Sequence, residues 1–456
     1  MEPHPHGQSV LHALLHKKTH AKIQKRAGKV GNMKGIEYLK NKLSVKSGRV
    51  LTRYKYYEMK NAQPNLGKLI DQEMADKYKS TLGWCAKAVD SMADRLCLSG
   101  FDDDTFDVQS IFNMNNPDVL FDSAILSALI SSCCFIYIFT GDDGTVKLQV
   151  IDGENATGII DPTTGLLSEG YAVLERDADS NNVLKDAYFA PGVTTVYDHK
   201  NRLKTDYTNK VAYPLLVPII YRPDAKRPFG HSRISRACMS LQNKAGITLT
   251  RSDITSQFYS FPQRYALGLS DDTEFDSKKA SMSSFISFGK DEDGSIPSVG
   301  QFTQQNMEPH IEQFKMYTAA FAGETGLTMD DLGFATENPA SSEAIKAGHE
   351  TLRLTARKAQ RTFGSGFINV GFIAACLRDN YPFQRRQFYN TKAHWMPIFE
   401  PDAAQMSGIG DAAIKINQAV PGYFDKDNLE RLTGLTGGDN VGTVGDINSG
   451  TENVHK

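Results

Sequence analysis

The stretch "ATENPASSEAIKAGHETLRLTARKAQRTFG", residues 335–364, contains the strongest helix signal in the chain. Asn338 followed by Pro339 predicts the start of a helix. The asparagine side chain can satisfy an orphan N–H, and proline at the first helical position has no N–H to lose. Glu343 would lie in the first turn, where the helix dipole favours negative charge. A polar, acidic loop therefore leads into a capped helix.

This predicted helix has two distinct faces. One face collects apolar and small residues at steps of three and four: Ile345, Gly348, Leu352, Ala356, Ala359 and Phe363. Another face carries charge: Lys346, Glu350, Arg353, Arg357 and Arg361. The second face, called the basic stripe below, is either solvated or in contact with something acidic, such as DNA or a neighbouring subunit. We expect the helix to continue through residues 367–381 after a kink at the glycines of residues 364–366.

Length and composition describe an ordinary globular chain. Its 456 residues suffice for about three domains. The net charge of −2 lacks the basic surplus of proteins that grip nucleic acid electrostatically. The six cysteines form no C-x-x-C pair, and we expect them to be buried and reduced: Cys85, Cys97, Cys133, Cys134, Cys238 and Cys376. The N-terminus has no apolar segment followed by a cleavage site, so we expect no signal peptide.

The apolar stretch "VLFDSAILSALISSCCFIYIF", residues 119–139, could be mistaken for a membrane span. It contains Asp122 and four serines, and its period changes from helical to strand-like. The turn signal Asp143-Gly144 follows it. We therefore predict a helix, a strand, a hairpin turn and a second strand, and no membrane segment.

Residues 1–34 form a basic, histidine-rich tail that we expect to be disordered. Met33 is an alternative start, and the tail could touch phosphates or acidic partners. His12, His16 and His20 could share a helical face and bind a metal, but the disordered tail is the preferred interpretation.

The rest of the chain divides by pattern. Helices and then an antiparallel sheet are predicted for residues 35–231, with hairpin turns at residues 143–144, 161–165 and 177–182. Two long helices, residues 232–260 and 307–326, enclose a short turn-rich segment with strands. Ser232 can cap the first of them, and Pro262 ends it. A strand at residues 383–401, two short helices and a glycine-rich end complete the chain.

A search for catalytic motifs finds none. The chain has no phosphate-binding loop, no H-E-x-x-H, no nucleophile elbow and no dinucleotide fingerprint. We therefore predict a structural or assembly role, with no enzymatic activity, no cofactor and no metal.

The order of five segments resembles the portal proteins of long-tailed bacteriophages, of the siphophage type. They are "RYKYYEMKN", "ISSCCFIYIFTGDDG", "PFGHSRIS", "FYSFPQRYALG" and "FAGETGLTMDDLGFATENPASSEAIKAGHETLRLTARKAQRTFG". The resemblance runs from Gly35 to about residue 435, and "NPASSEAI" with the helix behind it is its most specific part.

The resemblance implies an α+β portal fold with named parts. These are an α/β wing (35–231), a two-helix stem (232–260 and 307–326), a small α/β clip (261–306), a tunnel loop (327–341), a long kinked wing helix with a return strand (342–399), and a helical crown with a flexible C-terminus (400–456).

It also implies a function. Twelve copies would form a ring at one capsid vertex, through which double-stranded DNA enters during terminase-driven packaging and leaves at ejection. Expected partners are the large terminase, a head–tail adaptor, and the major capsid and scaffolding proteins, with no membrane. The expected location is the virion, and the host cytoplasm during assembly.

The resemblance places the tunnel loop against the DNA. Its candidate channel residues are Thr328, Asp330, Asp331, Glu337 and Asn338. Acidic side chains suit a conduit, because every phosphate neutralised by a cation would add affinity and slow sliding. The basic stripe would meet acidic surface on a neighbouring copy, through Lys346, Arg353, Arg357 and Arg361. Closed rings use such heterologous contacts.

Two alternatives stay open from sequence. One is another phage head-assembly protein, such as a minor head or scaffold-associated protein. The other is a DNA-processing enzyme, which would need clustered carboxylates for a metal or a phosphate-binding loop.

Overall fold

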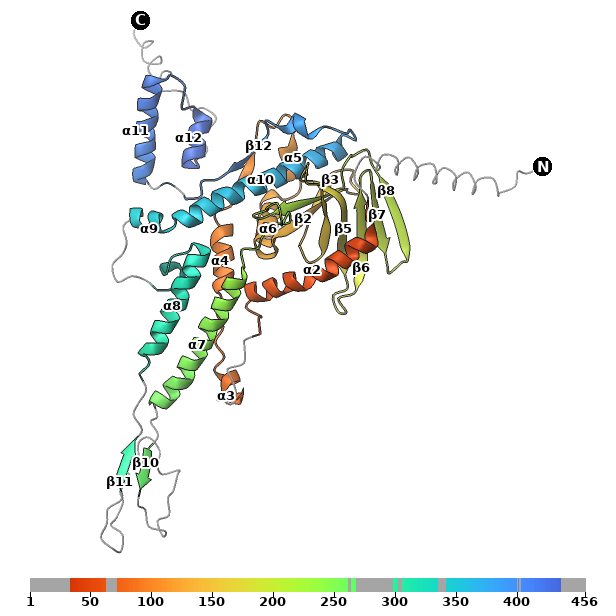
Figure 1. The fold of residues 1–456 in the computed structure, drawn as a ribbon. Coiled ribbons are helices and arrows are strands. Elements are labelled where there is room, and N and C mark those ends of the chain that lie inside the picture. Colours follow the sequence, from red (N-terminus) through yellow and green to blue (C-terminus); the bar gives the residue numbers. More distant parts are fainter. Residues whose placement is uncertain are drawn as a thin grey trace, which may run out of the picture. The chain divides into compact units, whose positions relative to one another are not determined.

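The structure is a computed structural model that describes residues 33–62, 72–260, 264–267, 298–301, 306–334, 342–399, 401 and 403–435. The chain forms two compact units (Figure 1). Unit 1 contains Met1–Tyr54, Ala88–Ile234 and Glu350–Lys456, and unit 2 contains Lys55–Lys87 and Ser235–His349. The predicted N-terminal tail, with its three histidines, lies outside the described residues.

Unit 1 contains a five-stranded antiparallel meander. Its strands follow one another in space as they do in sequence: β4 (Ala156–Ile160), β5 (Leu167–Arg176), β6 (Val183–Ala190), β7 (Val193–Asp198) and β8 (Leu203–Thr208). The predicted turns at residues 161–165 and 177–182 join the first three strands, so both predictions are confirmed.

Helix α2 (Ile36–Tyr57) is fixed to this sheet at its N-terminus. The buried carboxylate of Glu169 on β5 accepts hydrogen bonds from the backbone N–H groups of Lys34 (2.6 Å) and Gly35 (2.8 Å). Leu39 packs beside these bonds against Tyr171 of the same strand. A distant strand therefore caps the helix, because helix N-termini leave N–H groups without intrahelical partners.

A second sheet of three strands lies in the centre of unit 1, in the order β3 (Val146–Ile151), β2 (Cys133–Thr140), β9 (Leu216–Ile220). Helix α6 (Pro117–Ser131) precedes β2, and Gly144 makes the turn between β2 and β3 at φ 76°. The predicted succession of helix, strand, hairpin turn and strand is confirmed. Among the described residues, no helix is both long enough and apolar enough to cross a membrane.

The two faces of this sheet are covered differently. Cys134 of β2 contacts the Ala124 carbonyl of α6 (3.1 Å), and its cross-strand partner Ile219 lies against the long helix α10 (Glu350–Arg378). Cross-strand partners share a face, so α6 and α10 cover the same one. On the opposite face Tyr137 packs edge-on against Phe189 of the meander, with ring centroids 5.1 Å apart.

Helix α10 runs without interruption through residues 364–366, so these glycines do not end it. The kink expected there stays a prediction. The glycines of α10 permit close packing. A Cβ on Gly366 would lie 2.9 Å from Ile219 Cδ1, and one on Gly371 would lie 2.1 Å from Val108 Cγ1 of α5 (Val108–Asn113). Glycine in a helix interior costs some stability, and here the packed neighbours offset that cost.

The chain after α10 differs in part from prediction. A 3₁₀ turn, η2 (Arg385–Phe388), precedes a short strand, β12 (Lys392–Trp395), which pairs with β1 (Leu98–Asp102). The strand expected over residues 383–401 is therefore much shorter. Two helices follow as predicted, α11 (Ala403–Ala419) and α12 (Lys426–Thr433).

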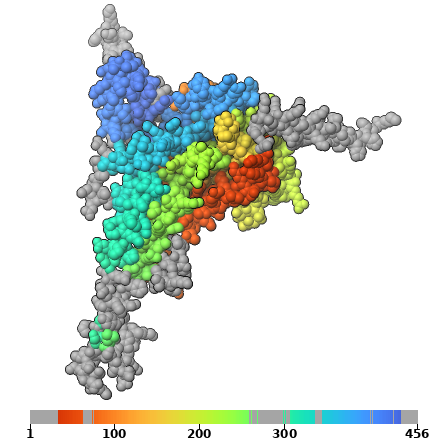
Figure 2. All heavy atoms as spheres, viewed as in Figure 1, coloured from red at the N-terminus to blue at the C-terminus, as the bar shows by residue number. Residues whose placement is uncertain are grey.

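Unit 2 is built on an antiparallel pair of helices, α7 (Arg236–Ser260) and α8 (Glu308–Thr325), which lie side by side in Figure 2. Trp84, the first residue of α4 (Trp84–Ala93), packs on Phe314 and Phe321 of α8, with ring centroids 5.4 and 5.2 Å apart. Trp84 is buried by this packing. The short helix α3 (Gln72–Lys77) precedes α4.

Both long helices of unit 2 lie where the sequence predicts them, but α7 begins later than residue 232. Ser235, not Ser232, accepts the hydrogen bond from the Cys238 N–H (3.1 Å). Ser232 instead donates to the carbonyl of Ile130 (2.5 Å), which holds it outside the helix. Between α7 and α8 the structure describes residues 306–307 and two strands, β10 (Arg264–Leu267) and β11 (Ser298–Gln301), which form an antiparallel pair.

Candidate channel loop and subunit contacts

The loop after α8 begins with a left-handed glycine. Gly326 (φ 72°) ends the helix, and its N–H donates to the Ala322 carbonyl (2.8 Å). Leu327 is then buried, which fixes the loop's exit direction. The short 3₁₀ turn η1 (Asp330–Leu332) follows. The candidate channel residues Glu337 and Asn338 lie outside the described residues, as does the predicted cap at Asn338-Pro339.

Asp331 is fixed inside this loop. Its Oδ2 accepts hydrogen bonds from the backbone N–H and the hydroxyl of Thr328, both at 2.9 Å, and contacts His349 Nε2 at 2.9 Å. Burial alone would raise the pKa of the Asp331 carboxyl, but the bonds from Thr328 and His349 outweigh burial and hold that pKa below its usual range. Thr328 and Asp331 therefore shape the loop, whereas Asp330 is exposed.

His349 is the partner of Asp331 that sequence reasoning missed. It is 8% exposed, and its Nδ1 lies 2.8 Å from the Ile345 carbonyl while its Nε2 faces Asp331. Both ring nitrogens therefore face an oxygen acceptor. A histidine inside a helical pattern gives no sequence signal for this contact, because its partner is 18 residues away.

The predicted helix from residue 340 is divided at His349. Helix α9 (Ser342–Gly348) belongs to unit 2, and α10 starts at Glu350 in unit 1. The predicted apolar face holds in α10, where Leu352, Ala356, Ala359 and Phe363 are buried. It fails in α9, where Ile345 is 50% exposed.

The basic stripe is divided by the same break. Lys346 lies on α9, and the three arginines lie on α10. Arg353 is paired within the helix, since its Nε and Nη2 each donate to Glu350 at 2.7 Å. Arg357 and Arg361 are exposed. The basic stripe is therefore divided into two surfaces, one on each unit. On α10 its exposed cations are Arg357 and Arg361.

No group of three or more histidine, cysteine, aspartate or glutamate side chains is arranged to hold a metal in the part of the chain that the structure describes. A polar cluster is centred on the buried Asp186, which accepts from Tyr171 (2.8 Å) and contacts Lys40 (3.3 Å) and His199 (3.1 Å). These contacts join α2 to the meander, which is a structural arrangement.

Comparison with known proteins gives a family and relatives. A family model described as "Phage portal protein, SPP1 Gp6-like" matches residues 36–397. The portal proteins of Mycobacterium phages L5 and D29 are each 23% identical, over 345 and 338 residues. The first alignment covers 70% of this chain and 69% of the relative, and the second covers 68% of each.

The comparison with solved structures matches the chain to two structures of a native gene transfer agent particle: its virion, and its neck computed with C12 symmetry. Their TM-scores are 0.38 and 0.39, at 12% identity, covering 85% of this chain and 99% of each of those chains.

Proposed function

Because the chain belongs to the SPP1 Gp6-like family of phage portal proteins, we propose that twelve copies form a ring at one capsid vertex. Double-stranded DNA passes through this ring during packaging and ejection. The observation that carries the proposal is the family match over residues 36–397. The role is structural and is exercised in the virion after assembly in the host cytoplasm.

The parts of the fold receive roles in this proposal. Unit 2 supplies the stem (α7 and α8) and the clip around β10 and β11, which meets the large terminase and later the head–tail adaptor. The sheets of unit 1 with α10 form the wing. Helices α11 and α12 form the crown on the capsid side, where the major capsid and scaffolding proteins assemble.

The loop after α8 lines the DNA path in this proposal. Asp330 is its exposed acidic side chain among the described residues, and it faces phosphate without binding it. Thr328 and Asp331 hold the loop's shape through their mutual hydrogen bonds and the contact with His349. Glu337 and Asn338 remain predicted members of the same surface.

The basic stripe is a proposed subunit contact through Arg357 and Arg361, which are exposed on α10. Arg353 contributes less, because Glu350 already neutralises it. Arg357→Glu with Arg361→Glu should reduce ring formation and leave the melting temperature nearly unchanged, since exposed charges contribute little to folding. Normal assembly combined with early melting would show that the stripe serves packing within one chain.

Electron microscopy of the purified chain tests the ring, and in vitro packaging tests the channel. We expect rings of twelve copies and no nuclease or ATPase activity.

Asp330→Lys with Glu337→Lys should leave rings intact but stall packaging, because cations in the passage hold phosphates. Asp330→Asn with Glu337→Gln is the matched control. A monomer at micromolar concentration contradicts the ring, and normal packaging by the lysine variant contradicts the loop assignment.

A further inference from the structure

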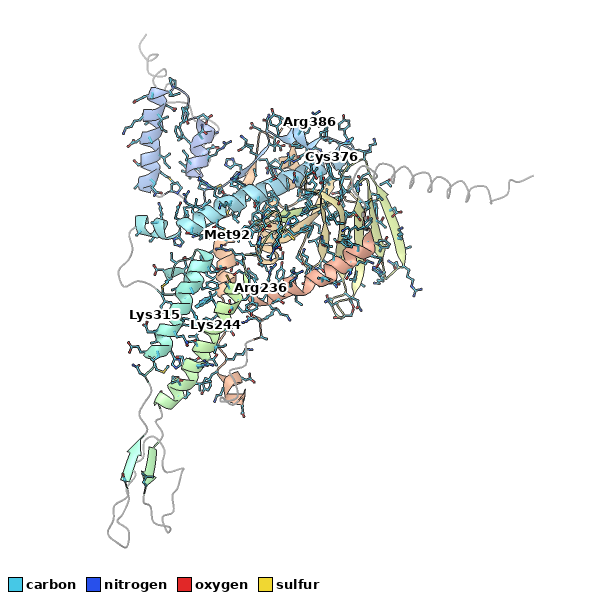
Figure 3. The ribbon with its side chains drawn as sticks, in the orientation of Figure 1. Met92, Arg236, Lys244, Lys315, Cys376 and Arg386 are labelled. Carbon is cyan, nitrogen blue, oxygen red and sulfur yellow. The ribbon has the colours of Figure 1, made fainter. Side chains whose placement is uncertain are left out.

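Strand β8 is an open edge of the five-stranded meander in unit 1. In the sheets of the described chain it pairs with β7 only, and all six of its residues are exposed. Figure 1 shows β8 as the outermost strand of the meander, and Figure 3 adds the side chains that stand on its faces. The β7–β8 register runs without a bulge. A regular, exposed edge strand is a template on which another strand can pair.

The hydrogen-bond pattern shows which backbone groups of β8 face this edge. The N–H of Asn209 donates to the carbonyl of Gly192 (3.0 Å), one step beyond the last pair of the β7–β8 ladder. Hydrogen-bonded and non-hydrogen-bonded pairs alternate along an antiparallel ladder, so the odd-numbered residues of β8 bond to β7. The even-numbered residues therefore point their backbone N–H and C=O groups outward: Lys204, Asp206 and Thr208.

The side chains of β8 are segregated between its two faces. Lys204 and Asp206 lie on one face, and within the described residues no ion pair engages either of them. The opposite face carries Leu203 (60% exposed) and Tyr207 (58% exposed), with Thr205 between them. The edge therefore offers one charged face and one largely apolar face.

Two copies of β8 complement each other in one antiparallel register, in which Thr205 lies opposite Thr205 of the second copy. Lys204 of each copy then lies opposite Asp206 of the other, on the same face of the sheet. Leu203 of each copy lies opposite Tyr207 of the other on the second face. Opposite charges and apolar pairs in these positions stabilise a sheet. The outward backbone groups of the even-numbered residues also meet, so the ladder and both ion pairs form together.

The neighbouring registers are less favourable. A shift of one residue puts each outward-pointing residue opposite one whose backbone groups already bond to β7. A shift of two residues keeps the ladder but places Lys204 opposite Lys204, or Asp206 opposite Asp206, and like charges directly opposite each other are destabilising. A lysine at a sheet edge normally discourages pairing. Asp206 of the second copy offsets that effect in one register only.

We propose that β8 docks on β8 of a second copy and joins the two meanders into one antiparallel sheet. Each copy contributes the same strand, so the contact is two-fold and differs from the heterologous contact of a closed ring. It goes beyond the proposed function and does not depend on the ring. Pairing occupies the open edge of both copies. One strand from each copy is a small interface, so the contact should be weak and depend on concentration.

A cysteine at the centre of the proposed register tests the contact. Two Thr205 residues would form a non-hydrogen-bonded pair with Cα atoms about 4.5 Å apart, which a disulfide can span. Oxidised Thr205→Cys should therefore run as a dimer on a denaturing gel, with a yield that rises with protein concentration. Thr208→Cys is the matched control, because the two residues would lie six positions apart, roughly 20 Å. The unaltered chain gives the background from the exposed Cys97.

Charge changes in the Thr205→Cys background test the register. Lys204→Asp or Asp206→Lys places like charges opposite each other at two positions, so the rate of linking should fall roughly tenfold. Lys204→Asp combined with Asp206→Lys restores opposite charges without changing the net charge, and linking should recover. Asp206 also accepts a hydrogen bond from Thr195 (2.7 Å) within one copy. Lys204→Asp leaves that bond intact and so isolates the contact between copies.

The inference is wrong if Thr205→Cys links no more than the unaltered chain, or if Thr208→Cys links as readily. It is also wrong if single charge changes have no effect or the exchanged pair does not recover. Should a charge variant fail to fold, hydrogen exchange of the outward β8 amides in the unaltered chain decides, and it should slow as concentration rises. Protection independent of concentration would mean that a segment of the same chain occupies the edge, which overturns the pairing. Micrographs of the unaltered chain judge the proposed ring separately.

Discussion

Helices α9 and α10 are neighbours in sequence that are held by different means. Apolar packing holds α10 along most of its length, with Phe363, Phe367 and Phe372 fully buried. At the end of α9, the clearest tertiary anchor is His349, which bonds back to Ile345 and across to Asp331. Buried side chains pack against α10 along the segment that holds its three glycines, whereas α9 ends where His349 makes its polar contacts.

The largest expected effect is the loss of packing under α10. Phe367 is fully buried and its ring lies 4.9 Å from that of Phe121. Phe367→Ala should lower the free energy of unfolding by about 3–5 kcal/mol, since the cavity adds to the lost transfer energy. Urea unfolding at fixed protein concentration measures it. Leu354→Ala, at a residue 46% exposed on the same helix, is the control. Equal losses in both variants would refute the view that α10 is held by its buried face.

Replacing a glycine of α10 by alanine should destabilise the fold, because the added Cβ would meet a packed neighbour. Helical glycines in open positions lack such a neighbour. Gly366→Ala should destabilise by about 1–3 kcal/mol, because its Cβ would crowd Ile219. At Gly408 in α11 a Cβ would meet nothing within 4 Å. Gly408→Ala should therefore stabilise by about 0.5–1 kcal/mol, as alanine does in an open helix position. Thermal melting of both variants gives the two signs, and the same sign in both would contradict the close-packing explanation.

Removing His349 should loosen the loop without unfolding either unit. His349→Ala leaves the partly buried Asp331 carboxylate without one donor, a local cost of about 1–3 kcal/mol. Hydrogen exchange of the amides at residues 328–334 should speed up accordingly, while amides in α10 keep their rates. Asp330→Asn, which changes the exposed neighbour, is the control. Unchanged exchange in His349→Ala would mean that the Thr328 bonds alone hold the loop.

The smallest effect concerns pH. The pKa of Asp331 is lowered in the folded chain, because hydrogen bonds overcome the opposing effect of burial, so its ionised form stabilises the fold. That stability is present above the unfolded pKa of about 3.9 and is lost as the pH falls through the lower folded pKa. Between pH 5 and pH 2 the unaltered chain should therefore lose slightly more stability than Asp331→Asn. Identical acid unfolding curves would show that Asp331 gains nothing from ionisation.

Much of the fold was readable from local signals. Asp143-Gly144 and the two later turns predicted three hairpins, because glycine and aspartate supply the conformations that tight turns require. The steps of three and four in α7 and α8 predicted both helices to within a few residues. The α10 half of the basic stripe was placed correctly on an exposed face by the same periodicity.

Other features depended on partners distant in sequence. The sequence pattern could not show that Asp331 is held within the loop while Asp330 is exposed. That difference arises because the fold brings His349 to Asp331. The sequence pattern could not locate the break between α9 and α10. Two glycines close together, Gly364 and Gly366, suggest a break more strongly than Gly348 does. The structure shows that Gly366 instead lies against Ile219 inside α10.

The sequence by itself determined which segments are helical or extended, where the turns fall and which family the chain resembles, because backbone preference and periodicity are local properties. Only the tertiary structure decided which charges face outward, which carboxylate is held within the loop and where the long helix ends. Those outcomes follow from burial and from hydrogen-bond partners that lie far apart in sequence. Asp331 and His349 are 18 residues apart, and Glu169 and Lys34 are 135 residues apart.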